Sequence, residues 1–379
     1  MCSRGLRGIV LSLLVGTILA TSDKVTCTSQ MERDDRAATQ LKQRLQQFYA
    51  ENSQHFRLNE TVFLCAEHKM GTAFVGTLIR KLLSLLPYDQ RCILKDCNFE
   101  GGSSTQPAMC NMVELVNGTL QRVPVPRSSY CKSLDSYGRE TPWNQWDMSK
   151  GSIVLCPHGG FRNYTEAPFT NGGRLVQFLR DPWGTATSNY AYTLKGGEKW
   201  MFKPSQEFGG HSFYDAVTTH GGELAAAKFT ASRFKAVVSM LQQPLPEGML
   251  YMRLEDVMFD GYSVVKALQR MFEHIDFPTE IGIALSQDMC LHQTAALEAL
   301  DPCRENGRSQ RAHISSSEIK ARALRIMQEH GRIAAQLNAD RRVLNKHAPC
   351  MVRGCGIGAV PSHARVSAEA CMNAPYAGL

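Results

Sequence analysis

Four short apolar runs, at residues 61–66, 152–156, 174–179 and 249–254, most constrain how this chain can fold. They show almost none of the alternation between apolar and polar residues that marks a strand with one face in water. Strands that are apolar on both sides need cover on both faces, which is typical of a parallel sheet. The runs therefore predict an α/β fold in which helices flank a parallel β-sheet.

Helical periodicity lies between and after these runs and supports the same fold class. The helical patterns cover residues 73–86, 222–243, 262–274 and 316–338. Alternating strands and helices are what a parallel sheet wrapped by helices requires. A polar, amphipathic pattern within residues 30–58 predicts one more helix ahead of the sheet.

These patterns divide the chain into one large domain with appendages. We expect the domain at residues 59–345, an N-terminal helical segment at 23–58 and a peripheral or partly disordered tail at 346–379. Residues 90–148 are rich in Gly, Ser, Pro, Asn and Cys and show no sustained periodicity. We expect them to form an irregular insertion that is pinned by disulfides.

Residues 1–22 have the pattern of a signal peptide. Arg4 and Arg7 precede a 13-residue apolar run, and Ala20 and Ser22 are small residues that suit cleavage. An uncleaved signal anchor is the alternative, and both versions deliver the rest of the chain to the lumen of the secretory pathway. We expect a protein of the Golgi lumen or a secreted protein, which contacts a membrane only if the anchor is retained.

The cysteines and the glycosylation acceptors agree with that location. Of the 13 cysteines, twelve lie beyond the leader, an even number that is typical of disulfide-bonded proteins in an oxidising compartment. Asn59, Asn117 and Asn163 each begin an Asn-X-Thr acceptor sequence. We expect a disulfide-bonded glycoprotein with no metal site, because the cysteine pairs lack the tight spacing of structural zinc ligands.

The first apolar run ends in a loop, residues 68–73, that suits a phosphate group. A helical pattern follows the loop, and a helix N-terminus presents unpaired backbone N–H groups and the positive end of the helix dipole. Gly71 permits a close backbone approach, Thr72 supplies a hydroxyl and Lys69 supplies a mobile positive charge. The GxxxxGK[ST] spacing of nucleotide triphosphatases is absent, and an ordinary strand-to-helix turn is the alternative.

A second motif follows the third apolar run: Arg180-Asp181-Pro182, with Ser188 eight positions after the arginine. In order and spacing, the two motifs resemble those of the sulfotransferase family that uses 3′-phosphoadenosine 5′-phosphosulfate (PAPS) as sulfonate donor. In that family, a Lys-[Ser/Thr]-Gly-Thr-Thr loop holds the 5′-phosphosulfate, and an Arg and a Ser hold the 3′-phosphate. The resemblance covers roughly residues 60–345 and implies a secretory, Golgi-type sulfotransferase with a P-loop-like domain.

Carried over position by position, the resemblance makes Lys69 a catalytic residue that stabilises charge as the S–O bond breaks. It also gives Phe74 the position where an aromatic ring often stacks on adenine. The implied cofactor-binding residues are Lys69, Met70, Gly71, Thr72, Ala73, Phe74, Arg180 and Ser188. Two of them depart from the family pattern, because Met70 replaces a hydroxyl residue and Ala73 replaces a threonine.

Transfer of a sulfonate group to an alcohol also needs a base. His158 is the candidate, because it follows the second apolar run and precedes Arg180 by 22 residues, as the catalytic histidine of cytosolic sulfotransferases precedes their motif arginine. Golgi-type members often use a glutamate instead, so Glu67 and Glu166 are alternatives.

The sequence leaves the acceptor open. We expect a hydroxyl-bearing acceptor, first a carbohydrate and second a protein tyrosine, and no nucleic acid. Three tryptophans are candidates for stacking on a sugar: Trp143, Trp146 and Trp183. An inactive binding or scaffold protein with the same fold is the alternative to an enzyme, and the departures at Met70 and Ala73 favour it.

Overall fold

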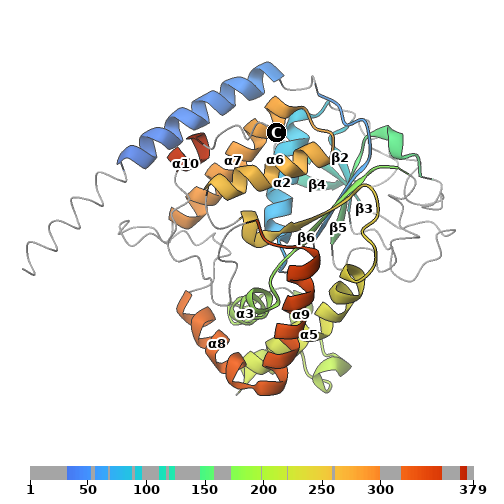
Figure 1. Cartoon of the computed structure of the whole chain (residues 1–379), viewed down its shortest axis with the longest axis vertical. Coiled ribbons are helices and arrows are strands. Elements are labelled where there is room, and N and C mark those ends of the chain that lie inside the picture. The colour runs from blue at the N-terminus through green and yellow to red at the C-terminus, as the bar shows by residue number, and fades with distance from the viewer. Residues whose placement is uncertain are drawn as a thin grey trace, which may run out of the picture.

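A seven-stranded sheet runs through the molecule in the order β4-β3-β2-β5-β1-β6-β7 (Figure 1). The structure is a computed structural model, and it describes residues 32–52, 56–66, 69–87, 90–95, 111–116, 119–123, 146–157, 172–197, 199–219, 221–257, 261–298, 317–351 and 368–373. Residues 1–22, for which the sequence predicts a signal peptide or anchor, lie outside these ranges.

The five neighbouring strands β2-β5-β1-β6-β7 pair in parallel. Strands β3 and β4 add an antiparallel edge beside β2. The strands are β1 Val62–Ala66, β2 Cys92–Lys95, β3 Asn111–Val116, β4 Thr119–Val123, β5 Ile153–Pro157, β6 Arg174–Leu179 and β7 Met249–Arg253. The four strands expected from the apolar runs are β1, β5, β6 and β7. The predicted fold class, a parallel sheet flanked by helices with a strand–loop–helix after β1, is confirmed.

Helices cover both faces of the sheet, as the continuous apolarity of its strands requires. The helices are residues 32–52, α2 Thr72–Leu85, α3 Pro182–Thr193, α4 Phe213–Thr218, α5 Gly222–Leu241, α6 Gly261–His274, α7 Thr279–Glu298, α8 Ser317–Glu329, α9 Gly331–His347 and α10 Ala368–Asn373. Short 3-10 helices add to them, including η9 Leu254–Val257 after β7.

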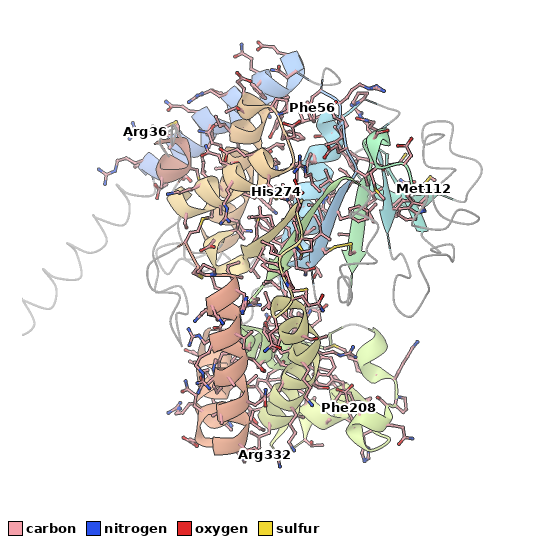
Figure 2. The ribbon with its side chains drawn as sticks, turned by 45° about the vertical axis from the view of Figure 1, so that its right-hand side comes forward. Arg36, Phe56, Met112, Phe208, His274 and Arg332 are labelled. Carbon is pink, nitrogen blue, oxygen red and sulfur yellow. A yellow bond between two sulfur atoms is a disulfide. The ribbon has the colours of Figure 1, made fainter. Side chains whose placement is uncertain are left out.

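Alternate side chains of β1 enter two different cores. Val62 and Leu64 pack with α2, α6, α7 and the helix over 32–52 on one face. Phe63 and Cys65 point to the other face, where α5 and the end of α9 cover the sheet. A third core lies beyond the sheet among α3, α4, α5, α8 and α9, which we call the helical lobe. Figure 2 shows Phe208 and Arg332 in this lobe, far from Met112 in the sheet.

The expected irregular insertion at 90–148 is wrong in part, because it supplies β2, β3 and β4 of the sheet. These strands have four to six residues, too few to show a period among the surrounding glycines and prolines. Their structure depends on pairing with β5 and with one another, which is a tertiary contact that local sequence does not reveal.

Two expectations about the C-terminal region also change. The single helix predicted at 316–338 is two helices, since the backbone breaks at His330 and α9 runs on to His347. The tail at 346–379 is not wholly peripheral, because Ala368 and Cys371 are buried in the core beside α7. Helix α7 itself has no counterpart among the expected helices.

Disulfides, expected from the cysteine count, are present. Cys65 and Cys156, which face each other in the register of β1 and β5, form one. A second, between Cys290 and Cys371, ties α10 to α7. Among the described residues, no helix is both long enough and apolar enough to span a membrane.

Gly151, just before β5, gives a test of the backbone geometry that places this strand beside β1. Its φ is +61°, and a Cβ there would overlap the carbonyl oxygen of Leu58. We expect Gly151→Ala to lower the free energy of unfolding by about 2 kcal/mol or more, from left-handed strain and from the overlap together. Urea unfolding measures the change.

Gly76 in α2 is the matched control, since a Cβ there meets nothing within 4 Å. Gly76→Ala should raise the free energy of unfolding by about 0.5–1 kcal/mol, because alanine costs less entropy in a helix. Equal effects of the two substitutions would contradict the described backbone.

Candidate functional site

The sequence motifs meet at one edge of the sheet. Because β5, β1, β6 and β7 are parallel, their carboxyl ends lie at the same edge, where open α/β sheets bind ligands. Lys69 follows β1, Arg180 follows β6 directly, and Glu255 follows β7. Strand β5 ends at Pro157, one residue before His158, which is outside the described residues.

The N-terminus of α2 is open at this edge. No side chain caps the helix, and Thr72 and Ala73 on its first turn are exposed. Gly71 precedes the helix with a φ of +120°, and a Cβ there would come within 3.2 Å of Leu254 Cδ1. Backbone N–H groups of the first turn are therefore available to an anion, in a loop that packs closely on η9.

The remaining predicted residues of this loop face inward. Met70 is 2% exposed, so its side chain is not available to a ligand. Phe74 is 7% exposed, and its ring lies 6.0 Å from the ring of Phe178 on β6. Both side chains anchor the loop to the core beneath it, and the stacking of Phe74 on adenine stays a prediction.

Arg180 joins the end of β6 to the loop. Its Nη1 donates a hydrogen bond to the carbonyl oxygen of Lys69 at 3.0 Å. Its guanidinium also lies against Gly184, where a Cβ would come within 3.2 Å of Nε. Burial lowers the pKa of Arg180, and the nearby carboxylates of Glu255 and Asp181 oppose that shift. The two predicted motifs are thus in direct contact through Arg180 and Lys69.

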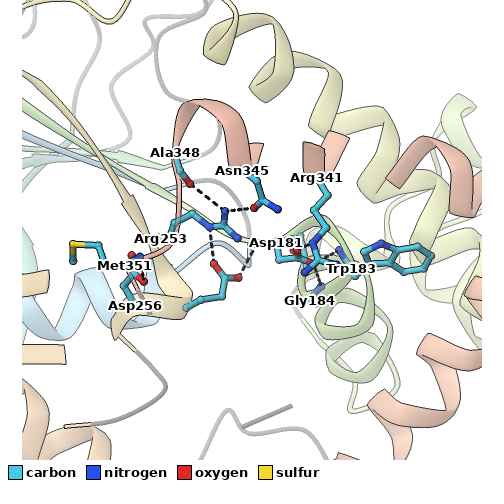
Figure 3. Close-up of polar contacts among 11 residues, drawn as sticks. Asp181, Trp183, Gly184, Arg253, Asp256, Arg341, Asn345, Ala348 and Met351 are labelled. Carbon is cyan, nitrogen blue, oxygen red and sulfur yellow. Dashed lines mark hydrogen bonds and ion pairs between the residues drawn. The ribbon is translucent and has the colours of Figure 1, made fainter. Parts of the chain in front are cut away.

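A buried ionic network of β7 and α9 reaches Asp181, the residue that follows Arg180 (Figure 3). Arg253 is 1% exposed, and its Nε lies 2.8 Å from Glu255 Oε2. Its Nη1 donates to Asn345 Oδ1 and to the carbonyl oxygen of Ala348. The other oxygen of Glu255 accepts a hydrogen bond from the backbone N–H of Asp181 at 2.7 Å. The network therefore fixes the residue that follows Arg180.

Asp181 carries the network into α3. Its Oδ1 accepts hydrogen bonds from the backbone N–H groups of Trp183 and Gly184, which caps the helix. Its Oδ2 forms an ion pair with Arg341 Nε of α9 at 2.8 Å (Figure 3). Burial raises the pKa of Asp181, while the charge of Arg341 acts in the opposite direction. The start of α3 is therefore fixed both by the capping hydrogen bonds and by the ion pair with Arg341.

One face of α3 is open beside this site. Gly184, Ser188 and Tyr192 lie four residues apart on one face of the helix and are partly exposed, whereas most residues between them are buried. Arg180 lies at the Gly184 end of this face, and Lys69 Nζ lies 3.0 Å from the centroid of the Tyr192 ring. The predicted residue Ser188 therefore lies between two points of contact with the site.

Lys320 on the first turn of α8 is a site residue that the sequence did not single out. Helix α8 packs against α3, and within the described part of the chain Lys320 has no hydrogen bond or ion pair. Its pKa is lowered to about 8 because it is partly removed from water and because Arg180 and Lys195 are positively charged. Such a group of cations favours an anion.

Several sequence predictions lie outside the described residues or change. Glu67, His158, Glu166 and Trp143 fall outside them, so the assignment of the base stays a prediction. Two of the tryptophans proposed for sugar stacking are buried: Trp146 and Trp183. Trp183 Nε1 donates to Asn338 on α9, so this indole belongs to the core of the helical lobe.

Comparison with known proteins gives little likeness. No protein-family model matches the chain, and no curated protein matches it. The solved structure of mouse sulfotransferase SULT7A1 complexed with PAP aligns with a TM-score of 0.38 and 12% sequence identity. That alignment covers 82% of this chain and 91% of the mouse chain. These values are too low to assign this chain to a family.

Arg180, Lys195 and Lys320 form a group of positive charges that we call the cationic cluster. Lys320 gives a pH-dependent test of it. Its pKa of about 8 is below the ordinary 10.5, so the folded protein is destabilised while Lys320 is charged and recovers as the pH rises above 8. We expect Lys320→Met to raise the free energy of unfolding at pH 7 by about 1–3 kcal/mol. This advantage should shrink by pH 10.

Unfolding of both proteins in urea at pH 7 and pH 10 measures the difference. Lys228, an exposed lysine of α5, is the control, and Lys228→Met should show no such pH-dependent advantage. An equal effect of Lys320→Met at both pH values would contradict the cluster.

Proposed function

We propose that this chain is a sulfotransferase that transfers the sulfonate group of PAPS to a hydroxyl group. The observation that carries the proposal is the set of cations around one sheet edge: Lys69 beside the open N-terminus of α2, Arg180 bonded to Lys69, and Lys320 beside Arg180. PAPS has anionic groups at two ends, and the site offers positive charge at two places, the start of α2 and the Arg180 end of α3.

The described residues divide into two binding functions under this proposal. Backbone N–H groups at Thr72 and Ala73, with the Thr72 hydroxyl, would hold the 5′-phosphate. Arg180 and Ser188 would hold the 3′-phosphate, and Lys320 would add a second cation there. An anion between Arg180 and Lys320 would relieve the repulsion of these two half-buried charges, so the residues fit the ligand.

Two side chains would perform the chemistry. When bound, PAPS supplies the sulfonate group and a phosphate leaving group. The Lys69 ammonium would stabilise negative charge on the oxygen that loses the sulfonate. His158, which follows β5 at the same sheet edge, would take the proton from the acceptor hydroxyl, with Glu67 and Glu166 as the alternative bases.

We further propose a carbohydrate hydroxyl as the acceptor and the secretory pathway as the location, either the Golgi lumen or outside the cell. The disulfides Cys65–Cys156 and Cys290–Cys371 support an oxidising compartment. A protein tyrosine is the second candidate acceptor.

One observation favours an inactive binding protein instead. The Met70 side chain is buried and Ala73 has no hydroxyl, so Thr72 is the only hydroxyl residue at the start of α2. A hydrogen bond to a charged group contributes about 1.5–3 kcal/mol, so this loop would hold a phosphate less tightly than one with three hydroxyls. Retained binding of the nucleotide without turnover would support this second function.

Nucleotide selectivity tests the first proposal. We expect 3′,5′-adenosine diphosphate to raise the melting temperature of the protein and ATP to raise it much less, because only the former places a phosphate at Arg180 and Lys320.

Lys69→Ala and Arg180→Ala should each abolish binding or turnover of PAPS, whereas Lys228→Ala should leave both unchanged. Full activity of the Lys69 or Arg180 variant would overturn the assignment.

The base has a separate test. We expect His158→Ala to reduce kcat by about 100-fold or more while the affinity for 3′,5′-adenosine diphosphate changes little, since a base acts on the acceptor and not on the nucleotide. Steady-state turnover and nucleotide titration measure the two quantities. If Glu67→Ala or Glu166→Ala gives this result instead, the glutamate is the base.

A further inference from the structure

Both ends of Lys69 are held in place, and two different residues hold them. Its backbone has a φ of +62°, in the left-handed region, and its carbonyl oxygen accepts the hydrogen bond from Arg180. Its ammonium lies 3.0 Å from the centroid of the Tyr192 ring, at the other end of the open face of α3. The Lys69 side chain therefore extends from the Arg180 contact to the Tyr192 ring.

Tyr192 is itself fixed by the turn that ends α3. Its carbonyl oxygen accepts hydrogen bonds from the backbone N–H groups of Lys195 and Gly197, at 3.1 and 3.3 Å. Gly197 lies against the ring, because a Cβ there would come within 3.5 Å of Tyr192 Cε1 and would overlap the sulfur of Met201. The ring is half-buried, so it gives a partly desolvated surface of fixed orientation.

The charges around the ring explain what it contributes. Arg180 contacts the backbone of Lys69, and Arg180 and Lys195 are the positive charges that act on Lys320. Like charges nearby disfavour a further ammonium group. The face of an aromatic ring attracts an ammonium, more strongly when the contact is partly removed from water. A lysine with four methylene groups otherwise has many rotamers, and repulsion would favour those that point into water.

We propose that Tyr192 is a positioning residue that holds the ammonium of Lys69 over the open face of α3. The role rests on the proposed sulfonate transfer, because the rate of that transfer would depend on the position of the Lys69 ammonium. The aromatic ring makes this contact. Phenylalanine at position 192 should therefore keep the positioning role, and leucine should lose it. Nucleotide affinity depends mainly on Arg180, Lys320 and the start of α2, so a change at Tyr192 should affect turnover more than nucleotide binding.

The contact can be measured without any activity. Reductive methylation with ¹³C-formaldehyde labels lysine ammonium groups and keeps their charge, and the Lys69 signal is the one that disappears in Lys69→Arg. A ring at 3.0 Å shifts the methyl protons of Lys69 upfield. We expect that shift in the wild type and in Tyr192→Phe, and its loss in Tyr192→Leu. Tyr190→Leu is the matched control, because Tyr190 of the same helix bonds to Glu223 and should leave the shift in place.

Turnover and binding complete the test. We expect Tyr192→Leu to lower kcat about tenfold, the order of effect of one partly desolvated cation–π contact, with the Kd for 3′,5′-adenosine diphosphate changed less than about threefold. Tyr192→Phe should keep kcat within about twofold. If the upfield shift of the Lys69 methyl protons persists in Tyr192→Leu, the contact is overturned. If that shift is lost while kcat is unchanged, the positioning role is overturned. A wild type that shows the shift but neither binds nor turns over PAPS would overturn the proposed function and leave the contact established.

Discussion

The candidate site depends on the buried ion pair between Arg253 and Glu255. Arg253 is almost wholly removed from water, so its charge requires the carboxylate beside it. The same carboxylate accepts the N–H of Asp181, and Asp181 caps α3 and pairs with Arg341. Removal of one partner would leave an uncompensated buried charge, which typically costs about 3–5 kcal/mol. The position of Arg180 follows from this network, because it precedes Asp181 in the chain.

The network and the cationic cluster have opposite electrostatic character. Every cation of the network has a carboxylate partner, whereas Lys320 beside Arg180 has none among the described residues. The first arrangement balances its buried charges, and the second leaves a positive charge that a bound anion would balance. Proteins commonly retain such local destabilisation at functional sites, because the ligand recovers the energy on binding.

The sequence predicted the parts of the fold that long or continuous patterns encode. The strands β1, β5, β6 and β7 and the helices α2, α5 and α6 follow from local patterns. The resemblance implied that the Lys69 loop and the Arg180 motif serve one cofactor, and the structure adds that the two are in contact. The strands β2, β3 and β4 could not be predicted, since they are short and depend on pairing. Lys320 and Tyr192 could not either: a lysine on a charged helix is ordinarily solvated, and a tyrosine on an apolar one is ordinarily core.

The two faces of helix α3 have different roles. Its buried face is bonded to the helical lobe through Trp183 and Asn338 and through Asn189 and Thr230. Its open face carries Ser188 and Tyr192. A helix held this firmly on one side presents the other side with little freedom, which a site of exact geometry requires. The lobe therefore acts on the site through α3, although most of its residues lie away from the edge of the sheet where the motifs meet.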